Sequence, residues 1–362
     1  MRWALGLSLG LLLAAKLWAG EAPPNNARIV TPGEGKLYHG VYPGGKSGAE
    51  DDLTAADYEA YKKACGQGAA WIYFSHNWYK RREFPMATAK WIHEAGAIPF
   101  IRLMLRSDDE EDHAEETYTL EAICDGKFDA DLKKWGAQAK AFGAPLLAEY
   151  GTECNGRWFP WNAFWYGKQG GTKREGAKKF AEAFKHIVAT VRAGGGTNVQ
   201  WVFHVNAEDE PDEKWNKFEQ YYPGDENIDF LAVSVYGPKK PKDEEMKTFV
   251  EQMDEVYPRL VALAPNKPIF LTEFGCASNH ARMPADKWAA AALDALFANK
   301  YPKVAGFSWW NERWENDNGE APTTMRLQDN AKLKDVFQQK FEANLKKLEL
   351  KPVYGAEKTE KK

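Results

Sequence analysis

The chain has 362 residues, and 48 Lys and Arg stand against 52 Asp and Glu, which gives a formal net charge of −4. This balance lacks the basic excess of a nucleic-acid-binding protein, and a charged fraction of 28% excludes a polytopic membrane protein. Aromatic residues make up 14% of the chain, with 15 tryptophans, and such a composition excludes a disordered chain.

The first element in chain order is a hydrophobic segment at the N-terminus. Met1 and Arg2 precede an apolar run that ends at Ala15, and small residues follow near Ala19. This pattern is typical of a secretory signal peptide, and the run is short for a membrane span. We therefore expect residues 1–20 to be a signal peptide of a secreted or periplasmic protein without a membrane span. A buried N-terminal helix is the alternative.

Eight apolar, β-rich runs follow along the chain, and amphipathic segments lie between them. Near-continuous apolar runs are typical of parallel strands that are covered on both faces. The predicted strands are residues 38–42, 69–75, 97–104, 145–153, 199–206, 228–236, 267–275 and 304–311. The predicted helices are residues 54–65, 85–95, 128–142, 175–192, 243–263, 284–300 and 330–348.

Eight strands that alternate with helices or long loops predict a (β/α)8 TIM barrel, an α/β fold, as a single domain over residues 25–348. A doubly wound open sheet is the alternative, but Gly44-Gly45 after the first strand lacks the spacing of a phosphate-binding loop. Residues 349–362 form a polar C-terminal tail, which we expect to fray from Val353. We expect a monomer.

The active site of such a barrel lies at the carboxyl ends of its strands. Two carboxylates stand out there, because Glu153 ends the fourth predicted strand and Glu273 ends the seventh. Either one alone also fits a salt bridge at the barrel rim. Two opposed carboxylates can cleave a glycosidic bond, one as the acid and the other as nucleophile or base, and their separation decides between retention and inversion.

Six tryptophans gather in two of the loops at this end of the predicted barrel. Indole rings pack against the flat C–H faces of pyranose sugars, so the two groups indicate a sugar-binding cleft; packing under long loops is the alternative for any one of them. Adjacent residues on a strand face opposite ways, so only one of Trp309 and Trp310 can line the cleft, and we favour Trp310. The six are Trp158, Trp161, Trp165, Trp309, Trp310 and Trp314.

The segment from Gly151 to Trp161, with its Glu-x-Asn-Gly-x-Trp spacing, resembles the acid/base segment of glycoside hydrolase family 26. The likeness continues through 201–206, 221–225 and 233–237 to 268–275. That family of (β/α)8 enzymes includes endo-β-mannanases, some β-glucanases and xylanases. The resemblance implies a polysaccharide substrate, with mannan favoured and β-glucan or xylan as alternatives.

By position, the resemblance makes Glu153 the general acid/base and Glu273 the nucleophile of a retaining reaction. Tyr236 would hydrogen-bond the nucleophile, and Trp158 would stack near the scissile sugar. Further substrate-binding residues are expected among the polar and aromatic side chains at the strand ends. These are Thr152, Trp161, Asn206, Trp310, His76 and Arg102.

One departure from the family pattern concerns specificity. Mannanases of the family have histidine immediately before the acid/base, and this chain has Thr152. A hydroxyl can donate one hydrogen bond to a sugar but carries no charge and does not stack. A branch acting on another polysaccharide is therefore as plausible as a mannanase. A non-catalytic carbohydrate-binding barrel and a transglycosylase with the same carboxylate pair are the alternative functions.

The sequence contains no pattern for a metal or cofactor. The four cysteines form no CxxC pair, and His76, His204 and His280 lack metal-ligand spacing. The acidic run at residues 106–116 fits a solvated loop better than a cation site. We expect neither a metal nor a cofactor.

Overall fold

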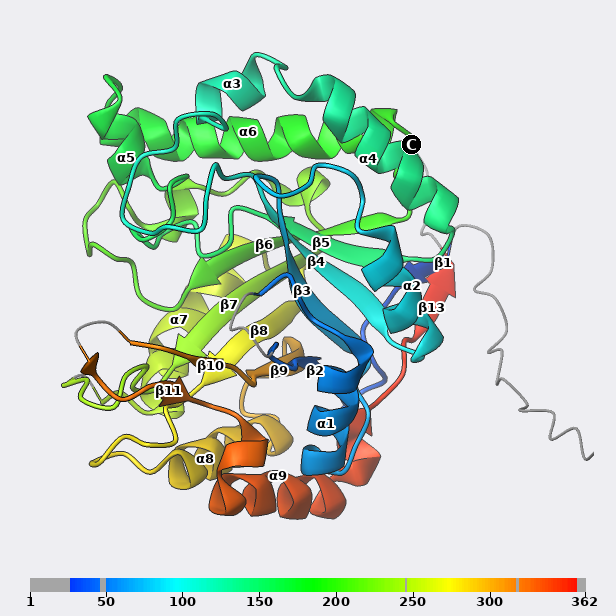
Figure 1. The fold of residues 1–362 in the computed structure, drawn as a ribbon, viewed down its shortest axis with the longest axis vertical. Helices are drawn as coiled ribbons and strands as arrows, with labels where there is room; N and C mark the ends of the chain where they lie inside the picture. Colours follow the sequence, from blue (N-terminus) through cyan, green and yellow to red (C-terminus); the bar gives the residue numbers. More distant parts are fainter. Residues whose placement is uncertain (1–26, 46–49, 245, 317–318, 357–362) are drawn as a thin grey trace, which may run out of the picture.

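A computed structural model describes residues 27–45, 50–244, 246–316 and 319–356. Eight parallel strands follow one another in chain order, and the last pairs with the first, so the sheet closes into the predicted (β/α)8 barrel (Figure 1). The short β12 (Leu348–Glu349) pairs parallel with the start of β2. The barrel strands are β2 (Leu37–Tyr42), β3 (Trp71–Asn77), β4 (Ile98–Met104), β5 (Leu146–Tyr150), β6 (Val199–Asn206), β7 (Phe230–Tyr236), β8 (Ile269–Gly275) and β9 (Val304–Trp310).

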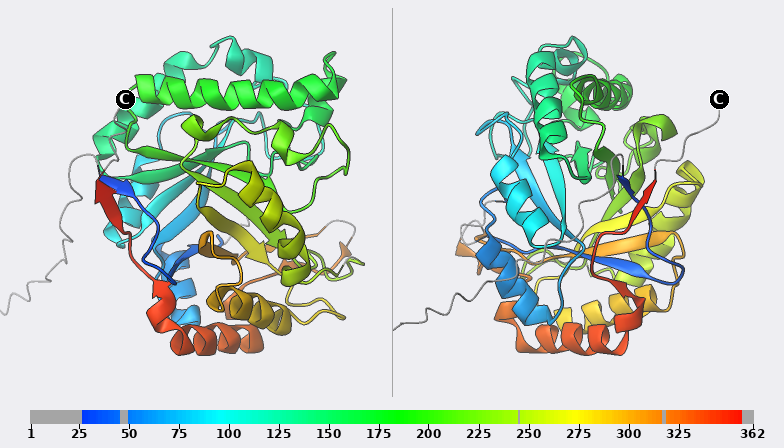
Figure 2. Two further views of the ribbon diagram at one scale, coloured as in Figure 1. Left: turned by 180° about the vertical axis from the view of Figure 1, so that it is seen from behind. Right: turned by 90° about the vertical axis from the view of Figure 1, so that its right-hand side faces the viewer.

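Helices cover the outside of the barrel (Figures 1 and 2). Because side chains fill the inside and helices cover the outside, every residue of β3, β4, β8 and β9 is buried, which explains why these strands are mostly apolar. The helices are α1 (Ala55–Cys65), α2 (Met86–Glu94), α3 (Leu120–Cys124), α4 (Asp129–Phe142), α5 (Ala163–Lys168), α6 (Lys173–Ala193), α7 (Phe249–Leu263), α8 (Ala285–Phe297) and α9 (Ala331–Ala343).

Helix α7 begins later than the sequence predicts. Asp243, the expected start, instead accepts hydrogen bonds from the backbone N–H groups of Lys239 and Lys240, and so stabilises a turn. The helix is capped at Thr248, whose side chain and that of Glu251 form a reciprocal capping box. An aspartate suits either a turn or a helix start, and here the turn is realised.

The first and last described segments close the end of the barrel at which the strands begin. Strand β1 (Ala27–Ile29) pairs antiparallel with β13 (Tyr354–Ala356), as Figure 1 shows. Both backbone groups of Ile29 also bond the side-chain amide of Gln200, near the start of β6. The expectation that the chain frays from Val353 is therefore wrong as far as the end of β13, because backbone pairing holds this segment.

The sequence predicts a signal peptide at the N-terminus and no membrane span. The predicted signal peptide, residues 1–20, lies outside the described residues. Among the described helices, none is long and apolar enough to cross a membrane. All four cysteines are free thiols, and three of them are buried.

Candidate active site

An open cleft of about 530 Å³ lies at the carboxyl ends of the barrel strands. Both predicted catalytic carboxylates, Glu153 and Glu273, line it. Tyr236 from the end of β7 and Trp310 from the end of β9 line it as well, and Trp158 contributes from the loop after β5. The cleft thus occupies the place where this fold positions its chemistry.

The backbone turns sharply between β5 and Glu153. The strand ends at Tyr150, and both Gly151 (φ 68°) and Glu153 (φ 48°) adopt the left-handed region. Glycine is required at 151 because a Cβ there would lie 2.2 Å from the ring of Phe180. For glutamate this conformation costs on the order of 1–3 kcal/mol, and such strain is concentrated at functional sites.

The spacing Glu-x-Asn-Gly-x-Trp has a direct structural reason. The buried amide of Asn155 donates to the backbone carbonyl oxygens of Asn206 and Glu208, which ties this loop to the segment after β6. Gly156 lies beneath the indole of Trp158, where a Cβ would approach the ring to 2.3 Å. The indole Nε1 then donates a 2.8 Å hydrogen bond to Oε2 of Glu153. The motif therefore positions one carboxylate.

Glu273 lies on β8 with only 3% of its surface exposed. The Tyr236 hydroxyl donates a 2.8 Å hydrogen bond to its Oε2, and Oε1 lies 3.3 Å from the hydroxyl oxygen of Tyr73 and 3.8 Å from the Arg102 guanidinium. Burial, together with the nearby charge of Glu153, raises the pKa of Glu273 to about 7, although Arg102 opposes this.

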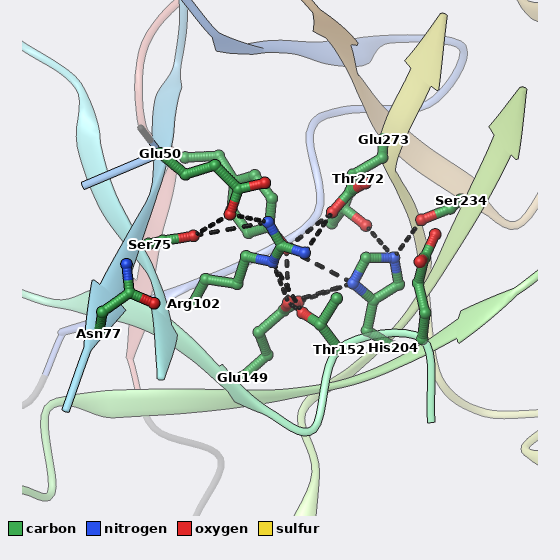
Figure 3. A network of polar contacts seen from close by, with 12 residues as sticks. Glu50, Ser75, Asn77, Arg102, Glu149, Thr152, His204, Ser234, Thr272 and Glu273 are labelled. Carbon is green, nitrogen blue, oxygen red and sulfur yellow. Dashed lines mark hydrogen bonds and ion pairs between the residues drawn. The ribbon is translucent and has the colours of Figure 1, made fainter. Parts of the chain in front are cut away.

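Arg102 lies at the centre of a polar network in the floor of the cleft (Figure 3). Its Nη1 pairs with Oε2 of Glu50 at 2.5 Å, and the Ser75 hydroxyl donates to the same oxygen at 2.6 Å. Although burial opposes ionisation, Arg102 and Arg106 hold the pKa of Glu50 below its ordinary value. Arg102 thus lies between two carboxylates of the cleft, Glu50 and Glu273.

A second pair lies deeper, below the cleft floor (Figure 3). Glu149 and His204 are both fully buried, and His204 Nδ1 lies 3.0 Å from Glu149 Oε2. The hydroxyls of Tyr73 and Thr152 also donate to Glu149. Burial alone would lower the pKa of His204 and raise that of Glu149, but each charge favours the other, so the histidine pKa is raised and the carboxyl pKa lowered.

The six clustered tryptophans do not all face the cleft. Trp158, Trp310 and Trp314 line it. Trp309 points the other way, as strand alternation requires, and its Nε1 donates to the carbonyl oxygen of Met325. Trp161 is buried and stacked on Phe159, with its Nε1 bonded to the backbone of Thr152, and Trp165 bonds the carbonyl oxygen of Arg157. Half of this cluster therefore supports the loops instead of lining the cleft.

Three further predicted substrate-binding residues lie elsewhere. Thr152 is fully buried, and its hydroxyl is occupied by Glu149 and by Arg102 Nε at 3.1 Å, so it does not face the cleft. Asn206 lines a smaller adjoining pocket, where its side-chain amide bonds the backbone. His76 faces the helix layer because its neighbour Ser75 faces the barrel interior, and burial lowers the His76 pKa to about 4.

The roles of Glu50 and Tyr73 are not apparent from the sequence. Glu50 lies in an acidic stretch before α1, and no pattern marks it as the partner of Arg102. Tyr73 lies on β3 at an inward-facing position, which strand alternation could have identified. Glu149 is a buried carboxylate of β5, and the structure gives it two charged partners, His204 and Arg102.

Residues 112–323, more than half of the chain, match the family described as glycosyl hydrolase family 26. An endoglucanase H from Acetivibrio thermocellus is 31% identical over 205 residues, which cover 55% of this chain and 21% of the relative. A mannan endo-1,4-β-mannosidase from Caldalkalibacillus mannanilyticus is 25% identical over 167 residues, covering 46% of this chain and 28% of the relative. The chain thus spans less than a third of the length of these curated relatives.

Solved structures share the fold. A family 26 β-mannanase from Bacteroides ovatus superposes with a TM-score of 0.62 at 16% identity, covering 90% of this chain and 95% of the other. An endo-β-1,4-mannanase double mutant from Cellulomonas fimi gives 0.61 at 18% identity, with 85% and 71% coverage. At these identities the likeness shows the (β/α)8 fold alone.

Proposed function

Because the chain belongs to glycosyl hydrolase family 26, we propose that it cleaves internal β-glycosidic bonds of a polysaccharide with retention of configuration. The carboxylate pair carries the proposal: Glu153 and Glu273 line one cleft, and each accepts a hydrogen bond from a dedicated donor, Trp158 and Tyr236 respectively. Two carboxyl groups beside the scissile bond are what most glycosidases require.

Glu273 is the proposed nucleophile. Tyr236 fixes one carboxylate oxygen, and Arg102 lies on the side of the other, so the group has one orientation toward the anomeric carbon. Burial raises the pKa of Glu273 to about 7, so the reactive ionised form is populated near and above neutral pH. A desolvated carboxylate is also the stronger nucleophile toward a developing oxocarbenium ion.

Glu153 is the proposed acid and base. Its carboxyl group, oriented by Trp158, protonates the leaving oxygen as Glu273 forms a bond to the sugar. Formation of that bond removes the charge of Glu273, so Glu273 no longer repels the ionised carboxylate of Glu153. Glu153 then takes a proton from water, which attacks the anomeric carbon and releases the sugar with its original configuration.

We propose β-mannan or β-glucan as the substrate class, with xylan as a third polymer to be tested. The curated relatives are named for endoglucanase and mannanase activities, which supports both. Trp158, Trp310 and Trp314 offer apolar faces in the cleft for neutral sugar rings. Thr152 is occupied beneath the floor and offers the sugar no imidazole, so this position adds no support for mannan over β-glucan. Secretion through an N-terminal signal peptide and a monomeric state remain part of the proposal.

The test is a reducing-sugar assay on mannan, mixed-linkage β-glucan and xylan with the wild type, Glu153→Gln and Glu273→Gln. Each catalytic variant is expected to lose at least about 100-fold in kcat, because it removes a proton-transfer group or the nucleophile. The matched control is Glu59→Gln, an exposed glutamate on α1. NMR of the first product is expected to show the β-anomer.

Several outcomes would contradict the proposal. Near-wild-type rates for either catalytic variant would exclude these roles, and an α-anomeric first product would exclude retention. Binding of a polysaccharide without release of reducing ends would favour the non-catalytic barrel. Transfer to an added sugar in preference to water would favour a transglycosylase.

A further inference from the structure

One carboxylate of the cleft is not used by the proposed reaction. Glu312, two residues after β9, is only 3% exposed and lines the cleft beside Trp310. Its Oε1 accepts a 2.7 Å hydrogen bond from the backbone N–H of Arg313. The Tyr42 hydroxyl lies near this carboxyl group, but within the described part of the chain neither it nor any other group donates a hydrogen bond of ordinary length to Oε2. A buried carboxylate oxygen without a donor is costly, so a partner is expected from outside the protein.

The backbone around this carboxylate is held firmly. The side-chain amide of Asn311 donates to the carbonyl oxygen of Pro43, and its oxygen accepts from the N–H of Leu327. The carbonyl oxygen of Glu312 accepts a 2.9 Å hydrogen bond from the N–H of Met325. These bonds fix the position of the carboxylate before any ligand arrives, which is how a binding site gains specificity.

The place of Glu312 in the barrel indicates which sugar it meets. In the closed strand order, β9 lies four strands from β5, so Glu312 and Glu153 stand on opposite walls of the mouth. The leaving sugar lies on the side of the acid Glu153. The sugar that keeps the anomeric carbon, the glycone, therefore extends toward β9, where Trp310 stacks on Tyr42 at a ring separation of 4.0 Å.

We propose that Glu312 is a specificity-determining residue whose Oε2 accepts a hydrogen bond from a hydroxyl group of a neutral sugar on the glycone side of the scissile bond. This inference rests on the proposed function. Glu50 and Glu315 line the same cleft, so an acidic sugar would meet carboxylates there. Burial raises the pKa of Glu312 to about 7, although the nearby Tyr42 hydroxyl and the Arg313 N–H both favour its ionised form.

The test compares Glu312→Ala and Glu312→Gln with the wild type on a series of oligosaccharides of the cleaved polymer. For substrates that fill the glycone side, Glu312→Ala is expected to raise KM about tenfold and to change kcat by less than about threefold, as for the loss of one hydrogen bond to a charged group. Glu312→Gln keeps an acceptor oxygen and is expected to lose less. The rise in KM is expected to disappear for substrates shortened at the non-reducing end, because they lack the sugar that would contact Glu312.

Affinity for intact oligosaccharides, measured by calorimetry with Glu312 and Glu312→Ala each in the Glu273→Gln background, separates this inference from the proposed function, because binding needs no turnover. If the wild type binds without hydrolysis, the proposed function fails and the tenfold loss of affinity in Glu312→Ala still tests Glu312. An affinity equal to that of the wild type overturns the inference. A lower melting temperature with unchanged affinity in both Glu312 variants also overturns it, because Glu312 would then stabilise the fold through its neighbour Tyr42. Glu59→Gln is the matched control.

Discussion

The indole Nε1 of Trp158 donates a 2.8 Å hydrogen bond to Oε2 of Glu153, five residues earlier in the chain. The contact depends on Gly156, because the absence of a side chain there leaves room for the indole ring. A side chain with no acid or base chemistry of its own thus fixes the carboxylate that we propose as the acid and base. The rest of the site follows the same principle, because Tyr236 holds Glu273 in a corresponding way.

The first prediction concerns Gly156→Ala. The added methyl group would lie 2.3 Å from the Trp158 ring, so the indole must move and Glu153 loses its hydrogen-bond donor. We expect kcat on polysaccharide to fall about 100-fold, a usual cost of misplacing a catalytic group by about 1 Å. Gly33→Ala, which meets no atom within 4 Å, is the control. Equal kcat values for the two variants would contradict this role.

The second prediction is a pH effect of Tyr236→Phe. Removing the hydroxyl removes a donor to the ionised form of Glu273, so the pKa of Glu273 rises further above its value of about 7. Because the nucleophile must be ionised, activity is lost as pH falls through this pKa. The acidic limb of the kcat/KM profile is therefore expected to move to higher pH. Tyr222→Phe, whose hydroxyl bonds Asp225 at the surface, should leave the profile unchanged.

The third prediction concerns the buried pair of Glu149 and His204. Because the pKa of Glu149 is lowered in the folded protein, its ionised form stabilises the fold at pH values above the ordinary pKa of 4.5. This contribution is lost as the pH falls through the lowered pKa. Because the pKa of His204 is raised in the folded protein, its protonated form stabilises the fold at pH values below the ordinary pKa of 6.5. This contribution is lost as the pH rises through the raised pKa. The pair therefore contributes most to the free energy of unfolding at pH values between 4.5 and 6.5.

His204→Gln is expected to lower the free energy of unfolding by about 3–5 kcal/mol in that window, because Glu149 is left as a buried charge without its cationic partner. The difference from the wild type should shrink on either side of the window in urea denaturation at a series of pH values. His186→Gln, which removes a partly exposed pair with Asp129, should cost at most about 1 kcal/mol. A difference that does not vary with pH would contradict this reading.

The fourth prediction is that Thr152 contributes to stability and not to substrate affinity. Its hydroxyl accepts from Arg102 and donates to Glu149 beneath the cleft floor. Thr152→Val keeps the shape but removes both bonds, and we expect a loss of about 1–3 kcal/mol in the free energy of unfolding with little change in KM. A large rise in KM at unchanged stability would show instead that the hydroxyl reaches the sugar.

Local patterns were sufficient for the architecture and for identifying Glu153 and Glu273, the two carboxylates that line the cleft and that we propose as catalytic. The apolar runs predict the barrel strands because both of their faces are buried, and glycines such as Gly66 end helices because they tolerate the left-handed conformation. Glu153 and Glu273 could be found because a carboxylate at the end of an apolar strand is unusual. Trp310 could be preferred over Trp309 because strand alternation has a period of two.

The partners of these residues were decided by the tertiary structure. Glu50 and Arg102 are 52 residues apart in the sequence, and Glu149 and His204 are 55 residues apart. The side-by-side arrangement of the strands brings each pair together, as β5 beside β6 does for Glu149 and His204. The same holds for the tryptophans, since Trp161 and Trp314 belong to similar aromatic clusters but only Trp314 lines the cleft. Sequence determines which side chains a local backbone can present, because propensity and periodicity are local. Which of them share a buried charge or a cleft wall depends on packing between distant segments.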